Sequence, residues 1–158
     1  GLILGALEKD DNGVPLPSGG IFWSLSHKPR YAGGVVSRQP VGLDIEEMRG
    51  FHPGLYKKTA APEEWALGGG PEQTLFFRFW TAKEAVIKAC GTGLRDLRKF
   101  RVETLEDDRS LVIRAQDRFW RVEQYCFDGH MAAITSHDQS IHGSIIRWTL
   151  TQEDLACI

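Results

Sequence analysis

The chain has 158 residues, of which 42% are hydrophobic and 25% are charged, and this length predicts one domain whose core needs no disulfide or structural metal. The 19 Lys and Arg residues nearly balance the 21 Asp and Glu residues, for a formal net charge of −2. This balance argues against a protein that binds nucleic acid through a general basic surface, although it is compatible with a locally basic pocket for a phosphorylated ligand.

The first part of the chain predicts three short strands after a turn-rich loop. The loop at 10–20 contains Asn-Gly, Pro and Gly-Gly sequences, which favour turns. Short apolar or alternating runs then predict strands at 21–25, 31–36 and 41–46. Three strands in such close succession predict a small meander.

The third strand carries two carboxylates on one face. Alternation places Val41, Leu43 and Ile45 on one face and Asp44 and Glu46 on the other. These carboxylates would lie about 6 to 7 Å apart along the strand, and with a third carboxylate they can hold a hard divalent cation such as Mg²⁺. The solvent side of an ordinary edge strand explains an isolated Asp-x-Glu pattern more often.

The middle of the chain predicts two helices. Pro and Glu residues at 62–64 predict the first turn of a short helix that ends at the glycines 68–70. A longer helix is predicted from 71 to about 90, where a Gly-Thr-Gly sequence ends it. Residues at three- and four-residue steps form its apolar stripe, which comprises Phe76, Phe79, Ala82, Val86 and Cys90.

The longer helix also presents Trp80, Glu84 and Lys88 in a row at four-residue spacing. Glu84 is the natural third carboxylate for a cation, and Lys88 shares its face. Lys83 lies about 100° around the helix, so it need not serve the same contact. A Glu–Lys pair at this spacing also occurs on ordinary helices, where it contributes about 0.2–0.5 kcal/mol.

The remaining chain predicts a second group of strands. They are expected at 99–102, 110–115, 118–127 and 131–136, with Asp128-Gly129 as the turn of a hairpin. Strands followed by helices and then by further strands indicate an α+β fold rather than a doubly wound parallel sheet.

The cysteines and the apolar segments bear on location. Cys90, Cys126 and Cys157 are odd in number and widely spaced, so a disulfide framework is not expected and a reducing cytoplasm is the predicted location. Because no apolar stretch approaches the roughly 18 to 20 residues needed to cross a bilayer, we expect no membrane association.

A group of hydrogen-bond donors lies where the first strand gives way to a turn. Ser26, His27, Lys28 and Arg30 supply four kinds of donor within five residues, and such a set can bind phosphate oxygens. A solvated turn is equally compatible with these residues. The sequence contains no Gly-x-Ser-x-Gly element, Walker-type glycine loop or Cys/His zinc cluster.

Three motifs, taken in their order, resemble those of the 4′-phosphopantetheinyl transferase superfamily. The first is Ser-x-Ser-His at 24–27, and the second is Gly-x-Asp-x-Glu at 42–46. The third is Phe-x-Phe-Trp-x-x-Lys-Glu-Ala-x-x-Lys at 77–88, followed by Gly-x-Gly-Leu at 91–94. The Ser-His element and the Trp before Lys-Glu resemble the larger surfactin-synthetase-activating type more than the small holo-acyl-carrier-protein synthase.

The resemblance implies transfer of the 4′-phosphopantetheine group from coenzyme A to a serine of an acyl or peptidyl carrier protein, with release of 3′,5′-adenosine bisphosphate. It implies dependence on Mg²⁺, for which Mn²⁺ can substitute in vitro, and a role in fatty-acid, polyketide or nonribosomal-peptide biosynthesis. The nucleophile then belongs to the carrier protein, which explains the absence of a nucleophilic triad.

The resemblance also implies roles for individual residues. Asp44, Glu46 and Glu84 match the carboxylates that bind Mg²⁺ together with the coenzyme A pyrophosphate, and Glu84 matches the proposed general base. Lys88 matches a lysine that contacts the pyrophosphate region, with Lys83 as its motif companion.

Further matches concern coenzyme A itself. Ser26 and His27 match phosphate contacts, and Lys28 adds a positive charge that can help to hold phosphate. Gly13 and Pro15 belong to a loop that resembles the one lying against the adenine portion.

The implied fold consists of small antiparallel sheets packed against a long central helix, within two pseudo-symmetric halves. In a single domain over 1–158, residues 1–40 would be a remnant of the first half, 41–136 the metal-binding and catalytic half, and 137–158 a C-terminal extension. The first half is expected to be short, either because the chain is truncated or because another chain, as in a homo-oligomer, completes the cleft.

Two other functions stay open from the sequence. A family member with a short first half could bind coenzyme A or a carrier protein without catalysing transfer. A metal-dependent phosphohydrolase could use the same three carboxylates without any carrier protein.

Overall fold

The computed structural model describes residues 5–50, 53–69, 72–92 and 97–136. The elements in this part of the chain are, in order, β1 (Phe22–Lys28), β2 (Tyr31–Ser37), β3 (Leu43–Glu47), α1 (Gly54–Thr59), α2 (Pro62–Ala66), α3 (Gln73–Cys90), the 3₁₀ helix η1 (Leu97–Lys99), β4 (Arg101–Leu105), β5 (Ser110–Ala115), β6 (Arg118–Phe127) and β7 (His130–Ser136). This order confirms the predicted α+β class. The predicted C-terminal extension at 137–158 lies outside the described residues, and the division into two halves stays a prediction.

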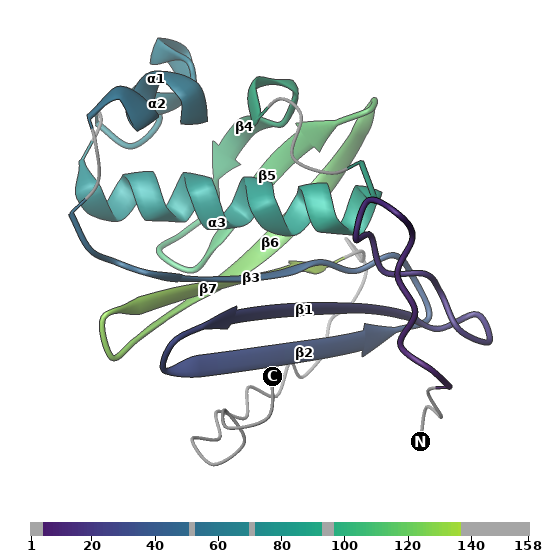
Figure 1. Ribbon diagram of the computed structural model, residues 1–158. Coiled ribbons are helices and arrows are strands. Elements are labelled where there is room, and N and C mark those ends of the chain that lie inside the picture. The colour runs from purple at the N-terminus through teal and green to yellow at the C-terminus, as the bar shows by residue number, and fades with distance from the viewer. Residues whose placement is uncertain (1–4, 51–52, 70–71, 93–96, 137–158) are drawn as a thin grey trace.

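The strands form two antiparallel sheets (Figure 1). One is the β1–β2 hairpin, and the other has the strand order β3-β7-β6-β5-β4. The predicted meander is therefore wrong, because β3 leaves the hairpin and pairs with β7, with Leu43 opposite Ile134 and Glu47 opposite His130. The reason is burial: β3 packs against the hairpin on one side and α3 on the other, which places it between two layers.

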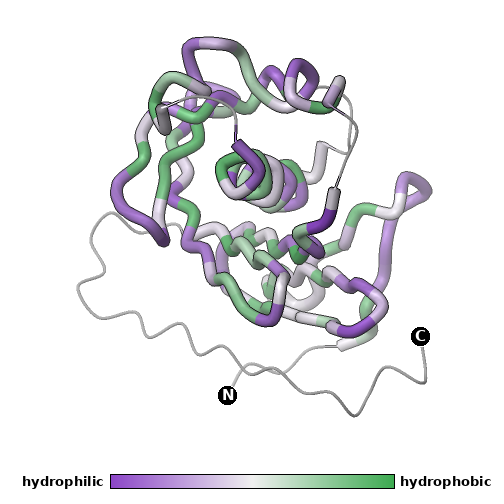
Figure 2. The backbone as a smooth tube through the Cα atoms, turned by 90° about the vertical axis from the view of Figure 1, so that its left-hand side faces the viewer, coloured by the Kyte–Doolittle hydropathy of each residue, from purple (hydrophilic) through white to green (hydrophobic). Residues whose placement is uncertain are grey.

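Helix α3 crosses the five-stranded sheet and anchors the core (Figure 1). Figure 2, which looks nearly along this helix, shows it enclosed by the sheet on one side and by other segments above and below. The predicted apolar stripe is buried from Phe76 to Val86, while Cys90 is half-buried. As predicted, the helix ends at Gly91, whose φ of 65° suits a residue without a Cβ. None of the helices described here is long and apolar enough to cross a membrane.

Some element boundaries differ from the prediction. The strand expected at 99–102 begins at Arg101 and continues to Leu105, because residues 97–99 form a 3₁₀ turn instead. Helix α2 is confirmed, and its Glu64 side chain accepts a hydrogen bond from the Ala61 N–H at the helix start. Helix α1 has six residues and no side-chain cap, which explains why no clear signal marks it in the sequence.

The β1–β2 hairpin is tied to the larger sheet at its turn. The Tyr31 hydroxyl donates a 2.6 Å hydrogen bond to the Asp128 carboxylate, and Arg30 forms an ion pair with the same group. Asp128 and Gly129 both have positive φ, which confirms the predicted hairpin turn between β6 and β7. These contacts fix the end of the hairpin that carries the predicted phosphate-binding residues.

The chain just before β3 approaches the backbone of α3 closely at Gly42. A Cβ at Gly42 would lie 1.8 Å from the carbonyl oxygen of Ala85, so only glycine permits this approach. The close crossing brings the carboxylates of β3 onto the face of α3 that carries Glu84 and Lys88.

Candidate functional site

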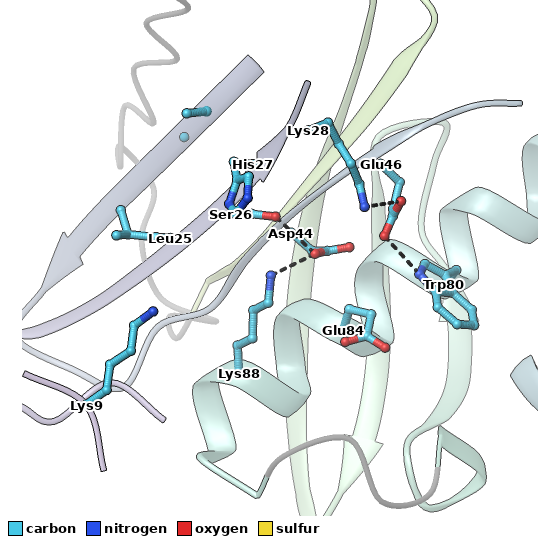
Figure 3. Close-up of a pocket in the computed structure, with 12 residues that line it drawn as sticks. Lys9, Leu25, Ser26, His27, Lys28, Asp44, Glu46, Trp80, Glu84 and Lys88 are labelled. Carbon is cyan, nitrogen blue, oxygen red and sulfur yellow. Dashed lines mark hydrogen bonds and ion pairs between the residues drawn. The ribbon is translucent and has the colours of Figure 1, made fainter. Parts of the chain in front are cut away.

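A cleft of about 450 Å³ lies between the hairpin, β3 and α3 (Figure 3). It joins three segments that the sequence analysis treated separately: the end of β1, the polar face of β3 and the Trp80–Glu84–Lys88 row of α3. Its lining residues are Lys9, Leu25, Ser26, His27, Lys28, Ala32, Gly33, Asp44, Glu46, Trp80, Glu84 and Lys88.

Asp44 lies at the centre of the cleft and is 4% exposed. Its Oδ1 accepts hydrogen bonds from Lys88 Nζ at 2.8 Å and from Ser26 Oγ at 3.2 Å, whereas its buried Oδ2 has no partner. Loss of solvent raises the pKa of Asp44 to about 6, against the opposing effect of the Lys88 charge.

Glu84 faces Asp44 from α3 and is 5% exposed. Its Oε1 is buried without a hydrogen-bond partner. Loss of solvent, followed by repulsion from the Asp44 carboxylate, raises the pKa of Glu84 to about 7. A carboxylate with a pKa near neutrality is suited to accept a proton from a reacting hydroxyl group.

Glu46 is held from two sides at the outer end of the cleft. Lys28 Nζ lies 2.8 Å from its Oε2, and Trp80 Nε1 donates a 3.3 Å hydrogen bond to its Oε1. Trp80 is itself stacked on Phe76, with ring centroids 5.7 Å apart. Trp80 therefore links the apolar core to a carboxylate of the site.

The basic side chains of the cleft fall into two groups. Lys28 and Lys88 are paired with Glu46 and Asp44, and Lys88 also donates to the carbonyl oxygen of Leu43 at 2.9 Å. Lys9 and His27 line the same cleft but form no ion pair with the described residues.

Lys9 is a lining residue that the sequence analysis missed. It pairs with Pro15 across a tight turn, in which the Asp10 carboxylate accepts hydrogen bonds from the N–H groups of Asn12 and Val14. The Asp and Asn-Gly residues of this turn are the sequence signal that could have pointed to Lys9, because such residues favour a turn that folds the segment back on itself.

The predicted residues Gly13 and Pro15 lie beside the cleft rather than in it. They line a neighbouring cavity of about 290 Å³ that shares Glu84 and Lys88 with the cleft. Gly13 has a positive φ of 78° and belongs to the turn that lines one side of this neighbouring cavity.

The structure does not bring Lys83 to the cleft. This side chain is fully buried, and its Nζ lies 2.6 Å from Glu64 and donates to the carbonyl oxygen of Thr59 at 2.7 Å. The 100° offset from the Trp80–Glu84–Lys88 row turns Lys83 toward α2 instead. A direct contact with coenzyme A, which the resemblance implied, is not supported by this placement.

The three predicted metal ligands share the cleft without forming a closed metal centre. Among the residues that the structure describes, no group of three or more His, Cys, Asp or Glu side chains is arranged to hold a metal ion. The donor chemistry nevertheless fits a hard cation, because the Asp44 and Glu84 carboxyl groups each keep one buried oxygen without a partner.

The two raised pKa values predict how stability depends on pH. Their ordinary values are 3.8 and 4.5, so the folded state binds both protons more tightly, and this stabilisation is lost as pH rises through about 6 for Asp44 and about 7 for Glu84. The melting temperature of the protein without ligands should therefore fall between pH 5 and pH 7.5. Thermal unfolding at several pH values measures this slope. Glu84→Gln should flatten it, and an unchanged slope in that variant would contradict the assignment.

Comparisons with known proteins point to one family. Residues 40–141 match the family model of the 4′-phosphopantetheinyl transferase superfamily. The chain is 31% identical over 114 residues to the 4′-phosphopantetheinyl transferase psf-1 of Bacillus pumilus, in an alignment covering 66% of this chain and 48% of that protein. It is 32% identical over 90 residues to the 4′-phosphopantetheinyl transferase HetI of a Nostoc species, with coverages of 52% and 38%.

A smaller relative also matches. The chain is 27% identical over 106 residues to a holo-[acyl-carrier-protein] synthase of Streptococcus thermophilus, which covers 61% of this chain and 82% of that protein. The aligned part of this chain spans about half or less of the first two relatives. The higher identity to those longer proteins agrees with the predicted resemblance to the larger type.

Proposed function

The chain belongs to the 4′-phosphopantetheinyl transferase superfamily, and from this membership we propose that it transfers the 4′-phosphopantetheine group of coenzyme A to a serine of an acyl or peptidyl carrier protein. The observation that carries the proposal is the convergence of Asp44, Glu46, Glu84 and Lys88 on one cleft. The residues that match the family's motifs in sequence therefore also meet in space.

In the proposed reaction, the carrier serine hydroxyl attacks the β-phosphorus of coenzyme A. A new bond forms between the serine oxygen and phosphorus, the bond to the pyrophosphate bridging oxygen breaks, and 3′,5′-adenosine bisphosphate leaves. Glu84 accepts the hydroxyl proton, a role supported by its unpartnered Oε1 and its pKa of about 7. Lys88 places positive charge beside the pyrophosphate, where negative charge accumulates as the bond breaks.

We propose Asp44, Glu46 and Glu84 as the residues that would hold Mg²⁺. A bound Mg²⁺ would neutralise charge on the phosphate oxygens. The proposal is supported by the all-oxygen donor set and by the two buried carboxylate oxygens that lack partners. Lys28 forms an ion pair with Glu46, and Lys88 forms one with Asp44. Each ammonium group therefore needs only a small movement of its side chain to interact with a phosphate group bound beside these carboxylates.

The remaining contacts with coenzyme A follow from the lining of the two cavities. Lys9, His27 and Lys28 supply positively charged or hydrogen-bonding groups for phosphate oxygens. Gly13 and Pro15 line the adjoining cavity, which suits them for the adenine portion. The cytoplasm is the proposed location, since coenzyme A and carrier proteins are the proposed partners.

A mass-shift assay tests this function. The protein is incubated with an apo carrier protein, coenzyme A and MgCl₂, and the carrier mass is measured; the expected result is a gain of one phosphopantetheine group. Omission of the divalent cation should abolish the gain. If several carriers gain no mass while calorimetry detects coenzyme A binding, the protein is a binding module instead. Hydrolysis of phosphoesters without a carrier would point to a phosphohydrolase.

A further inference from the structure

Trp80 lies between the cleft and a smaller neighbouring cavity. The smaller cavity has a volume of about 150 Å³, and both Trp80 and Glu46 line it as well as the cleft. The indole ring packs against the main core and stacks on Phe76, at an interplanar angle of 26°. Its N–H group donates to Glu46 Oε1 (Figure 3). The core therefore fixes the ring, while the polar atom of the ring contacts the carboxylate.

The two side chains that hold Glu46 differ in charge. Lys28 Nζ is an ammonium group 2.8 Å from Oε2, whereas the Trp80 N–H group is a neutral donor 3.3 Å from Oε1. A neutral donor orients a carboxylate without cancelling its negative charge, so the group can still attract a divalent cation. Each carboxylate oxygen can accept more than one contact, so the oxygen bound to Trp80 stays accessible to a metal ion.

A bound cation and a bound phosphate would act differently on these two contacts. A divalent cation beside Glu46 would repel the Lys28 ammonium group, and a phosphate group would attract it. The uncharged indole is not repelled by a cation, and its stacking on Phe76 keeps its N–H group in place. Trp80 is therefore the contact that can continue to orient Glu46 when ligands fill the cleft.

We infer that Trp80 is a positioning residue that orients the Glu46 carboxylate toward the cleft. This inference rests on the proposed function for its catalytic consequence, which is a higher affinity for the divalent cation. Loss of an outer hydrogen bond to a metal-binding carboxylate typically costs about 10- to 100-fold in metal affinity or activity. Because 3.3 Å is long for an N–H···O hydrogen bond, we expect a loss of about tenfold, at the lower end of this range.

The variant Trp80→Phe tests the hydrogen bond, because it keeps an aromatic ring and removes the N–H donor. Trp65→Phe is the matched control: Trp65 also stacks on a phenylalanine, Phe79, and its Nε1 donates to the carbonyl oxygen of Ala60 at 3.1 Å, away from the cleft. Without any ligand, the ¹³C shift of the Glu46 carboxyl group should change in Trp80→Phe and stay close to the parent value in Trp65→Phe. An unchanged shift in Trp80→Phe would overturn the inference.

The same contact can be tested from the side of the carboxylate. In Glu46→Ala, the indole N–H proton of Trp80 should shift upfield and exchange faster with solvent, while the indole signal of Trp65 stays in place. If Trp80→Phe does not fold, this comparison decides alone. An indole signal of Trp80 that is the same in Glu46→Ala and in the parent protein would contradict the inference.

Metal affinity tests the consequence of the contact. The probe is Mn²⁺, which accepts the same oxygen ligands as Mg²⁺, and electron paramagnetic resonance measures its free concentration in the presence of coenzyme A. The dissociation constant should rise about tenfold in Trp80→Phe and stay within about twofold of the parent in Trp65→Phe. In a Glu46→Ala background, Trp80→Phe should weaken binding by no more than about twofold further, because it acts through Glu46. Equal weakening in both backgrounds would refute this role.

Turnover separates positioning from general damage to the fold. In Trp80→Phe, the Mg²⁺ concentration that gives half-maximal carrier modification should rise about tenfold, while kcat at saturating Mg²⁺ stays within about threefold of the parent value. A loss of kcat that saturating Mg²⁺ does not restore would overturn the inference.

The proposed function can fail separately. A protein that binds coenzyme A and Mn²⁺ but modifies no carrier would refute the transferase proposal. The carboxyl shift, the indole signal and the Mn²⁺ dissociation constants would still decide whether Trp80 orients Glu46.

Discussion

Replacement of Glu84 by Gln is expected to lower kcat by about 10²- to 10⁴-fold, the usual contribution of a general base, while the protein stays folded. Gln has nearly the same shape as Glu but cannot accept the serine proton at neutral pH. Because Glu84 Oε1 has no hydrogen-bond partner to lose and the carboxyl group is destabilised by burial, the neutral amide should not reduce stability. Carrier modification followed by mass spectrometry, at saturating coenzyme A, measures kcat.

Glu63→Gln is the matched control, since it makes the same chemical change at an exposed position of α2. Its kcat should equal that of the parent protein. A Glu84→Gln protein with turnover within about threefold of the parent would remove Glu84 from the role of base. Circular dichroism and the melting temperature confirm that the comparison is between folded proteins.

Removal of one partner from the buried Lys83–Glu64 pair is expected to lower the free energy of unfolding by about 3–5 kcal/mol. Both side chains are almost fully buried, with Nζ and Oε1 2.6 Å apart. Glu64 also accepts hydrogen bonds from the N–H groups of Val102 and Ala61, so it joins α3, α2 and β4. Lys83→Met leaves this carboxylate without its cation in a dry environment. Urea denaturation measures the loss.

A solvent-exposed ion pair with the same N···O distance provides the control. Arg114 and Glu103 also lie 2.6 Å apart, but both remain partly exposed to solvent, so Arg114→Ala should cost about 1 kcal/mol or less. Similar losses in Arg114→Ala and Lys83→Met would refute the structural role of the buried pair. Folded Lys83→Met should retain more of its affinity for coenzyme A than Lys88→Met, since only Lys88 lines the cleft.

Local periodicity was enough to predict which side chains of the third strand and of the long helix face the cleft. The four-residue spacing of Trp80, Glu84 and Lys88 places them on one helix face, and strand alternation places Asp44 and Glu46 on one strand face. Both patterns depend only on backbone geometry within a single element. The resemblance to a family then joined the two elements, and the structure brings all five residues to one cleft.

Contacts between distant segments could not be predicted in the same way. The pairing of β3 with β7 joins residues about 90 positions apart, and nothing in Leu43 or Ile45 distinguishes β7 from the nearer hairpin as a partner. The Lys83–Glu64 pair depends on how α2 folds over α3. Lys9 enters the cleft through a turn, and loops carry no periodic signal for the direction of a side chain.

The side-chain contacts along β3 have a consequence for association between molecules. Free sheet edges readily add strands from other chains, which leads to aggregation. On this edge the N–H groups of Leu43 and Ile45 and the carbonyl oxygen of Leu43 are already bound by Ser24, Ser26 and Lys88. A foreign strand would have to displace these three side chains to pair here. The contacts that orient the site thus also protect this edge of the sheet against self-association.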